Sequence, residues 1–292
     1  LHVHGLWNRV VWAAAREAAR AGVPYVLSPR GMLEPAARAH RRWRKRAGWA
    51  LYDRRVVHGA SLLHATSETE RETLLALGTG APVACIPNGI DLGPPRRAVA
   101  GGSPLVLFIG RVHPIKRLDL LIDAFASVRA RCPDARLVIA GPDDPASRRR
   151  LTARAGRHAG AVAWTGPVDA AGRQSLLARA STLVMCSDSE SFGMSVLEAM
   201  AAGVPVVVTR TCPWADVERH QAGCWVEQSV PAIADAILRL VEDPRQAQAM
   251  GNRGRTLAAS RYEWNGIAAA VAARYLALPR PRLQAAAVPA TP

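Results

Sequence analysis

The chain has 292 residues, a length that allows one large domain or two ordinary ones. Hydrophobic residues make up 49% of it, which excludes a chain that is disordered throughout, and no apolar run approaches the roughly 18 residues of a bilayer-spanning helix. Lys and Arg (38) outnumber Asp and Glu (23). The resulting net charge of +15 predicts an anionic partner, which is nucleic acid, acidic lipid or a phosphorylated substrate.

The cysteines and the start of the chain indicate its setting. The five cysteines are scattered without a CxxC pair, so they indicate neither a zinc site nor a redox pair and suit a reducing cytosol. The chain opens with Leu1-His-Val-His, which is typical of the end of a buried strand and unlike a secretory signal. We therefore expect a cytoplasmic protein whose natural chain has residues before Leu1.

In chain order, the first part of the sequence alternates short apolar runs with amphipathic stretches. The pattern predicts a strand end at 1–3, a helix over 8–21, a strand at 24–28, a long helix over 36–58, and strands at 61–66 and 83–87. Thr66 or Ser67 is placed to cap a helix that begins at Glu68. Residues 93–103 are rich in Pro and Gly without an apolar period, which predicts a linker.

From Leu105 onward the alternation is regular. Apolar runs ended by Gly, Ser or Thr predict strands at 105–109, 136–140, 162–165, 182–186 and 205–209, with helices such as 117–131 and 193–202 between them. Because these runs are continuously hydrophobic, we expect strands that are buried on both faces of a parallel sheet. A last helix over 263–278 and a disordered tail over 279–292 complete the prediction.

These patterns predict an α/β fold of two Rossmann-like domains that face each other across a cleft, with the N-terminal domain incomplete. The expected boundaries are 1–92 for the first domain and 104–262 for the second. Ligands of open α/β sheets bind at the carboxyl ends of the strands, so we expect the site there.

The stretch 186–209 holds the first group of candidate residues. A helix begins near Gly193, and the backbone amides of Gly193, Met194 and Ser195 are placed to bind a phosphate at its positive end. Glu190 and Glu198 would repel that phosphate directly, so they suit the neutral hydroxyls of a nucleotide sugar. The alternative is that Glu190 only complements the helix dipole and Glu198 only faces solvent.

A second group lies in FIGRVHPIKRLDLL (108–121). Gly110 ends a buried strand, Arg111 follows it, and Lys116 precedes the next helix. An Arg fork and a mobile Lys charge are both suited to a diphosphate, and the topology brings them to the same crevice as Gly193. The alternative is that both are ordinary surface charges. The expected meeting of Arg111, Lys116 and the helix start near Gly193 at one crevice argues against that alternative.

Together three motifs resemble the group 1 glycosyltransferases, the large retaining family numbered four. They are S-E-S-F-G-M-S-V-L-E-A-M-A-A-G-V-P-V-V at 189–207, G-R-V-H-P-I-K-R at 110–117 and I-P-N-G-I-D at 86–91, and the likeness runs from Leu1 to about Tyr275. The resemblance implies the GT-B fold, with residues 1–92 on the acceptor side and 104–262 binding the nucleotide sugar.

The resemblance also implies roles for individual residues. Arg111 and Lys116 would neutralise the donor diphosphate, Glu190 would contact the sugar hydroxyls and Glu198 the ribose, the backbone of Phe192, Gly193 and Met194 would cradle the phosphates, and Gly166 would lie near the base. The donor would be a UDP- or GDP-sugar, with retained configuration, no cofactor and no obligatory metal. The Asp188-Ser-Glu190 sequence mimics a metal-binding Asp-x-Asp motif, and we interpret it as coincidence.

The N-terminal domain departs from the family pattern at one place. Many relatives carry a His-Gly segment after the strand equivalent to 24–28, whereas SPRGMLEP (28–35) puts Arg30 before Gly31, as in a subset of the family. Arg30 is always charged, so it suits a diphosphate or an acidic acceptor but not a base. His4 is the other catalytic candidate in this domain, with packing at a strand end as the alternative.

The segment 38–58 is strongly basic. On an unbroken helix, Arg38, Arg41, Lys45, Trp49 and Tyr52 share one face, and Trp43, Ala47, Ala50 and Val57 form the opposite face toward the core. The basic and aromatic face predicts contact with an anionic membrane on the inner face of the plasma membrane. A solvated charged face is the alternative.

The sequence therefore predicts a hexosyltransferase that acts on a saccharide or lipid-linked acceptor in cell-surface polysaccharide biosynthesis. The alternatives are a sugar phosphorylase or nucleotide-sugar epimerase of the same fold, or an inactive fragment that still binds nucleotide. A nucleic-acid partner is not expected, because no recognition motif accompanies the charge.

Overall fold

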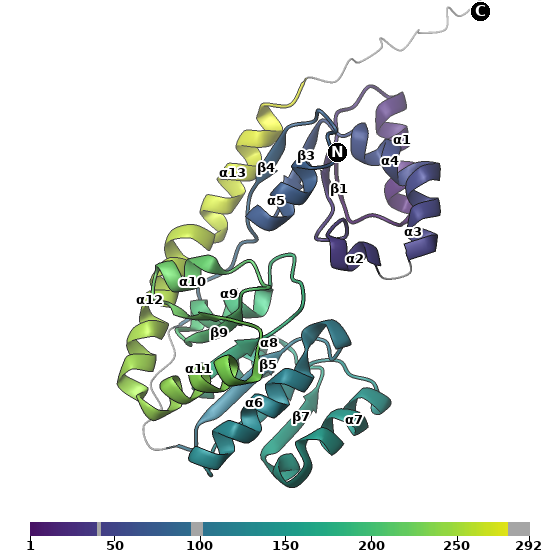
Figure 1. The fold of residues 1–292 in the computed structure, drawn as a ribbon. Helices are drawn as coiled ribbons and strands as arrows, with labels where there is room; N and C mark the ends of the chain where they lie inside the picture. Colours follow the sequence, from purple (N-terminus) through teal and green to yellow (C-terminus); the bar gives the residue numbers. More distant parts are fainter. Residues whose placement is uncertain (40–41, 95–101, 280–292) are drawn as a thin grey trace, which may run out of the picture. The chain divides into compact units, whose positions relative to one another are not determined.

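The computed structural model describes residues 1–39, 42–94 and 102–279 (Figure 1). The chain divides into two compact units. The first comprises Leu1–Pro87 and the chain from Ala268 onward, and the second comprises Asn88–Ile267. The division falls at 87/88, whereas the sequence predicted a first domain that ends at 92. The C-terminal helix α13 (Trp264–Leu276) begins in the second unit and continues into the first.

The first unit is built on a parallel sheet. Within the described residues its order is β1-β2-β3-β4, formed by β1 (His2–His4), β2 (Val26–Ser28), β3 (Leu62–Ala65) and β4 (Val83–Cys85). Helix α1 (Arg9–Arg20) is capped by Asn8, and helix α5 (Glu68–Leu75) is capped by Ser67, as the sequence predicts. The strands predicted in this part of the chain are therefore confirmed.

The predicted long helix over 36–58 is helical throughout its described part, but it is not a uniform α-helix. Its described part consists of α2 (Pro35–Ala39), α3 (Arg42–Gly48), the π-helical segment η1 (Trp49–Asp53) and α4 (Arg54–His58). A π-helical turn holds more residues than an α-helical turn, so it rotates every later side chain relative to an unbroken helix. The faces predicted from a uniform 100° step therefore do not hold.

The side chains of this segment differ from the prediction in their exposure. Trp43, predicted to face the core, is 69% exposed, and Ala47 and Ala50 are exposed as well. Trp49 and Tyr52, predicted on the outer face, are half-buried, and their rings lie against those of Trp7 and Trp12. Of the predicted core face only Val57 is buried, and Arg41 lies outside the described residues.

The second unit contains a larger parallel sheet. Within the described residues its order is β10-β9-β8-β5-β6-β7, with β5 (Leu105–Ile109), β6 (Arg136–Ala140), β7 (Val162–Gly166), β8 (Thr182–Met185), β9 (Val206–Thr209) and β10 (Gly223–Val226). The five strands predicted here are confirmed, and β10 was not predicted. In β5, Val106 and Phe108 pack into one core cluster while Leu107 and Ile109 pack into the other. Both faces of the sheet are therefore buried, as the continuous hydrophobicity indicated.

Helices cover both faces of this sheet (Figure 1). They are α6 (Leu118–Arg131), α7 (Pro145–Ala155), α8 (Ala170–Arg179), α9 (Met194–Ala202), α10 (Ala215–Arg219), α11 (Val230–Glu242) and α12 (Pro244–Tyr262), with 3₁₀ turns η2 (Pro114–Lys116) and η3 (Gly156–Ala161). Apolar residues of α6 and α11 pack on one face, and those of α8 and α9 pack on the other. The second unit is therefore a doubly wound α/β domain.

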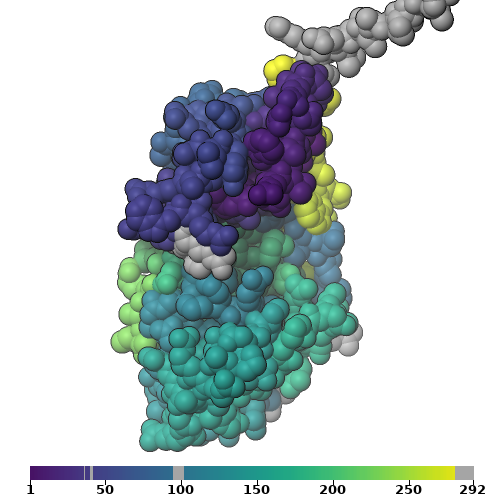
Figure 2. Space-filling view, turned by 90° about the vertical axis from the view of Figure 1, so that its right-hand side faces the viewer, coloured from purple at the N-terminus to yellow at the C-terminus, as the bar shows by residue number. Residues whose placement is uncertain are grey.

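The end of the described chain returns to its beginning. In the space-filling view, the yellow residues of the C-terminal helix lie beside the purple residues of the chain start (Figure 2). The hydroxyl of Tyr275 on α13 lies 2.5 Å from Nδ1 of His2 on β1. The greater part of the predicted linker, 95–101, and of the predicted tail, 280–292, lies outside the described residues.

No helix in the described ranges is both long enough and apolar enough to span a bilayer.

Candidate active site

The candidate site lies where the strand order of the second sheet reverses. From β5 the chain proceeds outward through β6 and β7, then returns to form β8 on the other side of β5. The loops that follow β5 and β8 therefore leave the same edge of the sheet from neighbouring strands. A crevice at such a reversal is the usual ligand site of open α/β sheets.

The loop after β5 is held in place by backbone contacts. The Gly110 amide donates to Ala140, and Gly141 lies so close that a Cβ on it would be 2.1 Å from the Gly110 carbonyl oxygen. His113 caps η2 with its ring nitrogen, and Lys116 is the last residue of this turn. The loop therefore presents the Lys116 side chain from a short, capped turn.

The loop after β8 leads into α9 through a glycine with a left-handed backbone. Gly193 has φ of 90°, and no side chain caps the first amides of α9. Phe192 is buried, its ring packs against Trp214 and Tyr262, and its carbonyl accepts a hydrogen bond from the Trp214 indole at 2.5 Å. This packing fixes the start of α9, whose N–H groups are left for a ligand or water.

The two loops enclose a cavity of about 510 Å³. It is lined by Ile109, Gly110, Arg111, His113, Ile115, Lys116, Arg173, Met185, Glu190, Gly193, Met194, Ser195 and Glu198. Three basic side chains (Arg111, Lys116 and Arg173), the uncapped start of a helix and two carboxylates thus meet in one cavity. Of the residues predicted for the donor site, only Phe192 and Gly166 do not line it: the Phe192 ring is part of the core, and Gly166 ends β7.

Lys116 and Glu190 form an ion pair across this cavity. The Lys116 ammonium contacts Oε1 of Glu190, and the Ser187 hydroxyl donates to the same oxygen at 2.8 Å. The two side chains are only 21% and 10% exposed. Asp188 pairs instead with Arg117, at 3.1 Å, so each acidic residue of the Asp-Ser-Glu sequence contacts a different cation.

Glu198 is the second carboxylate of the cavity. Its Oε1 accepts a hydrogen bond from Arg173 at 2.9 Å, whereas its buried Oε2 has no partner among the described residues. Burial raises the pKa of Glu198, against the opposing effect of Arg173. A buried oxygen without a partner is uncommon and suits a ligand that donates a hydrogen bond.

Arg111 completes the cationic side of the cavity. It is exposed, and in the described part of the chain no carboxylate pairs with it. Its charge is therefore available to an anion that enters the cavity.

The two candidates of the first unit lie next to each other. His4 ends β1 and Arg30 follows β2, and the guanidinium nitrogens Nε and Nη2 of Arg30 lie 3.4 and 3.3 Å from Nδ1 of His4. Burial, together with the charge of Arg30, lowers the pKa of His4, so the imidazole is neutral at pH 7. With Nδ1 accepting, the ring proton is on Nε2.

Sequence reasoning missed the residue that holds Arg30. Glu70 is buried in α5, and its carboxylate accepts hydrogen bonds from the Gly31 amide at 2.5 Å and from the Thr66 amide at 2.8 Å. These bonds support the Arg30–Gly31 turn, in which φ is 56° and then 74°. The sequence shows an acidic residue three places after a capping Ser, which is typical of a helix start. The contact of this residue with Gly31 depends on the tertiary structure and cannot be read from the sequence.

Arg173 was also missed. It lies on α8, after the turn that follows β7, and it is drawn to the site by its ion pair with Glu198. Nothing in the local sequence distinguishes it from the many other arginines of this chain.

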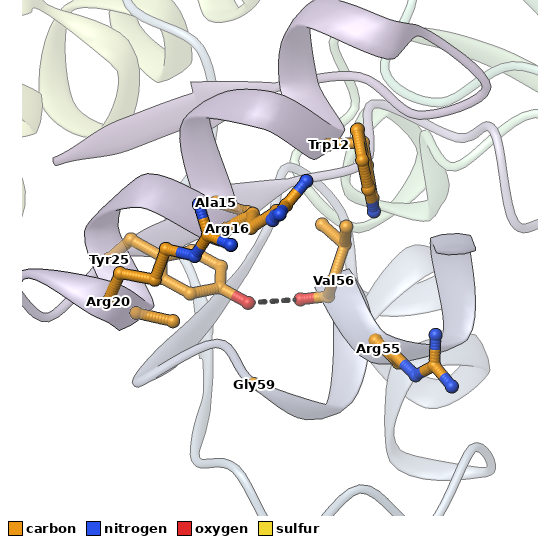
Figure 3. A pocket seen from close by; sticks show the side chains of 9 residues that line it. Trp12, Ala15, Arg16, Arg20, Tyr25, Arg55, Val56 and Gly59 are labelled. Atoms are coloured by element: carbon orange, nitrogen blue, oxygen red, sulfur yellow. Dashed lines mark hydrogen bonds between the residues drawn. The ribbon is translucent and has the colours of Figure 1, made fainter.

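A separate cavity of about 550 Å³ lies in the first unit, between α1 and α4 (Figure 3). The Tyr25 hydroxyl donates to the Val56 carbonyl oxygen at 2.6 Å beneath it, as the dashed line shows, and Trp12 and Arg16 project from α1. None of the residues predicted for catalysis or donor binding lines this cavity.

The fold class follows from a solved structure. The Anabaena protein HepE, in a complex with UDP and glucose, matches with a TM-score of 0.79 at 19% identity, over 95% of this chain and 78% of its own. The two parallel sheets of the chain thus belong to the GT-B fold, as the sequence predicted.

Sequence comparison extends this to a family. Residues 94–257 match "Glycosyl transferases group 1", and residues 1–89 match "Glycosyl transferase 4-like domain". The chain is 30% identical over 275 residues to a GDP-mannose-dependent alpha-(1-6)-phosphatidylinositol monomannoside mannosyltransferase of Mycobacterium tuberculosis, covering 85% of the chain and 71% of that relative. It is 33% identical over 207 residues to a phosphatidyl-myo-inositol mannosyltransferase of the same species, covering 66% of the chain and 53% of that relative.

The chain belongs to the group 1 glycosyltransferases, family 4, which are retaining hexosyltransferases that use nucleotide-sugar donors. The resemblance inferred from the motifs is therefore confirmed.

Proposed function

We propose that this protein transfers a hexose from a UDP- or GDP-sugar to a saccharide or lipid-linked acceptor in the assembly of a cell-surface polysaccharide. The observation that carries the proposal is the single cavity at the strand-order reversal, where Arg111, Lys116 and the start of α9 meet two carboxylates. Such a cavity offers positive charge to a diphosphate and hydrogen-bond acceptors to sugar hydroxyls.

The cations supply the electrostatic part of the reaction. When the bond between sugar and diphosphate breaks, negative charge develops on the leaving phosphate oxygen. The Arg111 guanidinium, the Lys116 ammonium and the amides of Gly193 and Met194 stabilise this charge, so the step proceeds without an obligatory metal ion.

The carboxylates position the donor. Glu190, held by Lys116 and Ser187, accepts hydrogen bonds from the hydroxyls of the transferred hexose. Glu198 accepts a hydrogen bond from the ribose through its unpartnered Oε2. The backbone at Phe192 cradles the phosphates, and Gly166 lies near the base.

The first unit provides the acceptor side. His4 carries a neutral imidazole with its proton on Nε2, and Arg30 is held beside it. We assign to Arg30 the binding of an anionic group of the donor or acceptor. We assign to His4 a hydrogen bond to the reacting sugar.

The protein also binds an anionic membrane from the cytoplasmic side in this proposal. The guanidinium carbons of Arg42 and Arg46 lie 5.3 and 5.7 Å from the centroid of the exposed Trp43 ring. Leu51, eight residues further along the chain, is 66% exposed. Aromatic and basic residues of this kind favour an anionic lipid surface. The first relative named above acts, by its name, on a phosphatidylinositol lipid.

Two measurements test the proposal. The first is a thermal-shift panel of UDP- and GDP-sugars. Sugars of one nucleotide should raise the melting temperature of the protein and those of the other should not, because a ligand that binds the native state stabilises that state. Glu190→Ala should abolish release of nucleotide in the presence of acceptor. Unchanged turnover in this variant, or cleavage that requires inorganic phosphate, would refute the assignment.

A further inference from the structure

A second cationic cavity lies in the first unit, apart from the donor cavity. It has a volume of about 380 Å³ and is lined by Trp7, Arg38, Ala39, Arg42, Lys45, Arg46 and Trp49. Four of these seven residues are basic, and none is acidic. No residue to which we have assigned a role in donor binding or catalysis lines it.

The four cations of this cavity have no acidic partner among the residues that the structure describes. In the described part of the chain no carboxylate forms an ion pair with Arg38, Arg42, Lys45 or Arg46. The Lys45 ammonium is half-buried and donates to the carbonyl oxygen of Ala37, and burial lowers the pKa of Lys45. Like charges that lie close together repel one another, and this repulsion lowers the stability of the folded protein. A bound anion would remove the repulsion.

Two tryptophans form the aromatic walls. The Lys45 ammonium lies 5.5 Å from the centroid of Trp7, the Arg38 guanidinium carbon lies 5.8 Å from that of Trp49, and the two rings are 6.4 Å apart. Trp7 has a left-handed backbone (φ 60°), and its amide donates to the buried carboxylate of Asp53 at 3.3 Å. Asp53 thus holds Trp7 from behind and does not line the cavity.

We propose that this cavity binds the diphosphate group through which a saccharide acceptor is joined to its carrier. The two to three negative charges of a diphosphate ester match four cations, and arginine forks and a lysine are the side chains that bind phosphate oxygens best. The rings of Trp7 and Trp49, packed against each other, offer an apolar surface to a group next to the diphosphate. That the ligand is an acceptor rests on the proposed function, whereas binding of the diphosphate itself does not.

The cavity shares Arg42 and Arg46 with the exposed surface that we assign to the membrane, but the two differ in their aromatic residues. Trp43 projects into solvent and does not line the cavity, whereas Trp7 and Trp49 are half-buried walls of it. A flat lipid surface reaches exposed side chains. A concave site beside two packed indole rings favours a single phosphorylated group.

The test is calorimetric titration with inorganic pyrophosphate in buffer of physiological ionic strength. The donor site is first saturated with whichever nucleotide, UDP or GDP, the thermal-shift panel shows to bind. We expect the wild-type protein to bind pyrophosphate under these conditions. Arg38→Ala and Lys45→Met should each weaken this binding by about 10-fold, the loss of one charge-assisted contact. Arg44→Ala is the matched control, because Arg44 is exposed on α3 but does not line the cavity, and it should change the affinity less than twofold.

The outcomes separate the two proposals. Absence of pyrophosphate binding in the presence of that nucleotide, or an equal loss in Arg44→Ala, overturns the cavity proposal. Failure of both UDP and GDP to bind instead refutes the donor site. Lys45 donates a hydrogen bond to the Ala37 carbonyl, so Lys45→Met can destabilise the fold. If Lys45→Met lowers the melting temperature, Arg38→Ala alone decides the outcome.

Vesicles of phosphatidylglycerol and phosphatidylcholine distinguish the source of the phosphate. Cosedimentation that depends on Arg38 and Lys45, without any binding of pyrophosphate, would assign the cavity to lipid headgroups and would overturn the acceptor proposal. Pyrophosphate binding that depends on these residues, with vesicle binding that depends on Trp43 instead, supports both assignments.

Discussion

Lys116 and Glu190, 74 residues apart in the chain, form a half-buried ion pair inside the donor cavity. The pair forms because β5 and β8 are neighbours in the sheet, so the loops that carry the two residues leave the same edge. While no donor is bound, each residue therefore neutralises the other. A diphosphate that enters must compete with Glu190 for the Lys116 charge.

This competition leads to an unusual expectation for Glu190→Gln. Removing the carboxylate charge frees Lys116, so UDP should bind about threefold to tenfold more tightly, a gain of about 1 kcal/mol. The rate of sugar transfer should nevertheless fall by about 100-fold or more, because the acceptor for the sugar hydroxyls is lost. Calorimetry with UDP and a nucleotide-release assay measure the two effects. Glu218→Gln, which removes an exposed carboxylate that pairs with Arg210, is the control, and weaker UDP binding in Glu190→Gln would contradict the prediction.

Glu198 should determine recognition of the ribose. Glu198→Ala removes the unpartnered Oε2, and we expect the affinity for the cognate nucleoside diphosphate to fall by about 10-fold, or about 1.4 kcal/mol. A 2′,3′-dideoxy analogue lacks the donor hydroxyls, so its affinity should be nearly the same in the variant and the wild type. Competition binding with both ligands checks this. A parallel loss for the analogue would show that Glu198 acts only by holding Arg173.

Gly193 should tolerate no side chain. It has φ of 90°, and a Cβ would lie 3.0 Å from Sδ of Met185 and 3.1 Å from the indole nitrogen of Trp214. We expect Gly193→Ala to lower the free energy of unfolding by about 1–3 kcal/mol. Chemical denaturation measures this, with Gly160→Ala as the control, since a Cβ at Gly160 would meet open space. Equal stability of the two variants would show that the start of α9 adjusts to a side chain.

The histidines of the first unit predict a dependence of stability on pH. His2 hydrogen bonds to Ser28 and Tyr275, and burial, reinforced by His4, His64 and Arg30, lowers the pKa of His2 to about 4 from 6.5. The folded state therefore resists protonation while the unfolded chain accepts it. The contribution of His2 to stability is complete above pH 6.5 and is lost progressively as the pH falls toward 4.

His2→Gln should flatten this dependence. Denaturant unfolding between pH 7 and 4 should show a smaller loss of stability in His2→Gln than in the wild type. His58→Gln, a change at an exposed histidine of the same unit, should follow the wild-type curve. Because the pKa values of His4 and His64 are also lowered, by burial first, some dependence should remain in the variant. Parallel curves for all three proteins would exclude His2 as a source.

Most single elements could be predicted from local sequence. Strands such as 105–109 and 136–140 were recognised because a continuous apolar run of five residues has few alternatives in an α/β chain. The helix start near Gly193 was recognised for a similar reason, since a polar loop follows the apolar run 182–186 and an amphipathic stretch begins at 193. The family followed from three such motifs taken together.

The segment 36–58 shows where local reasoning failed. Its charge and aromatic content were evident, but the faces were assigned with one helical period. The π-helical turn at Trp49–Asp53, whose Asp53 carboxylate accepts from the distant Trp7 amide, changed which residues are exposed. No periodic count contains that contact, because it depends on a residue 46 positions away.

The sequence alone thus determined most of the strands and helices and the family to which the chain belongs, since both depend on patterns within a few turns of the chain. Only the tertiary structure decided which charges meet. Lys116 pairs with Glu190, Arg173 pairs with Glu198, and four cations line one cavity without an ion pair to any carboxylate among the described residues. Coulomb energy depends on distance and burial rather than on separation along the chain.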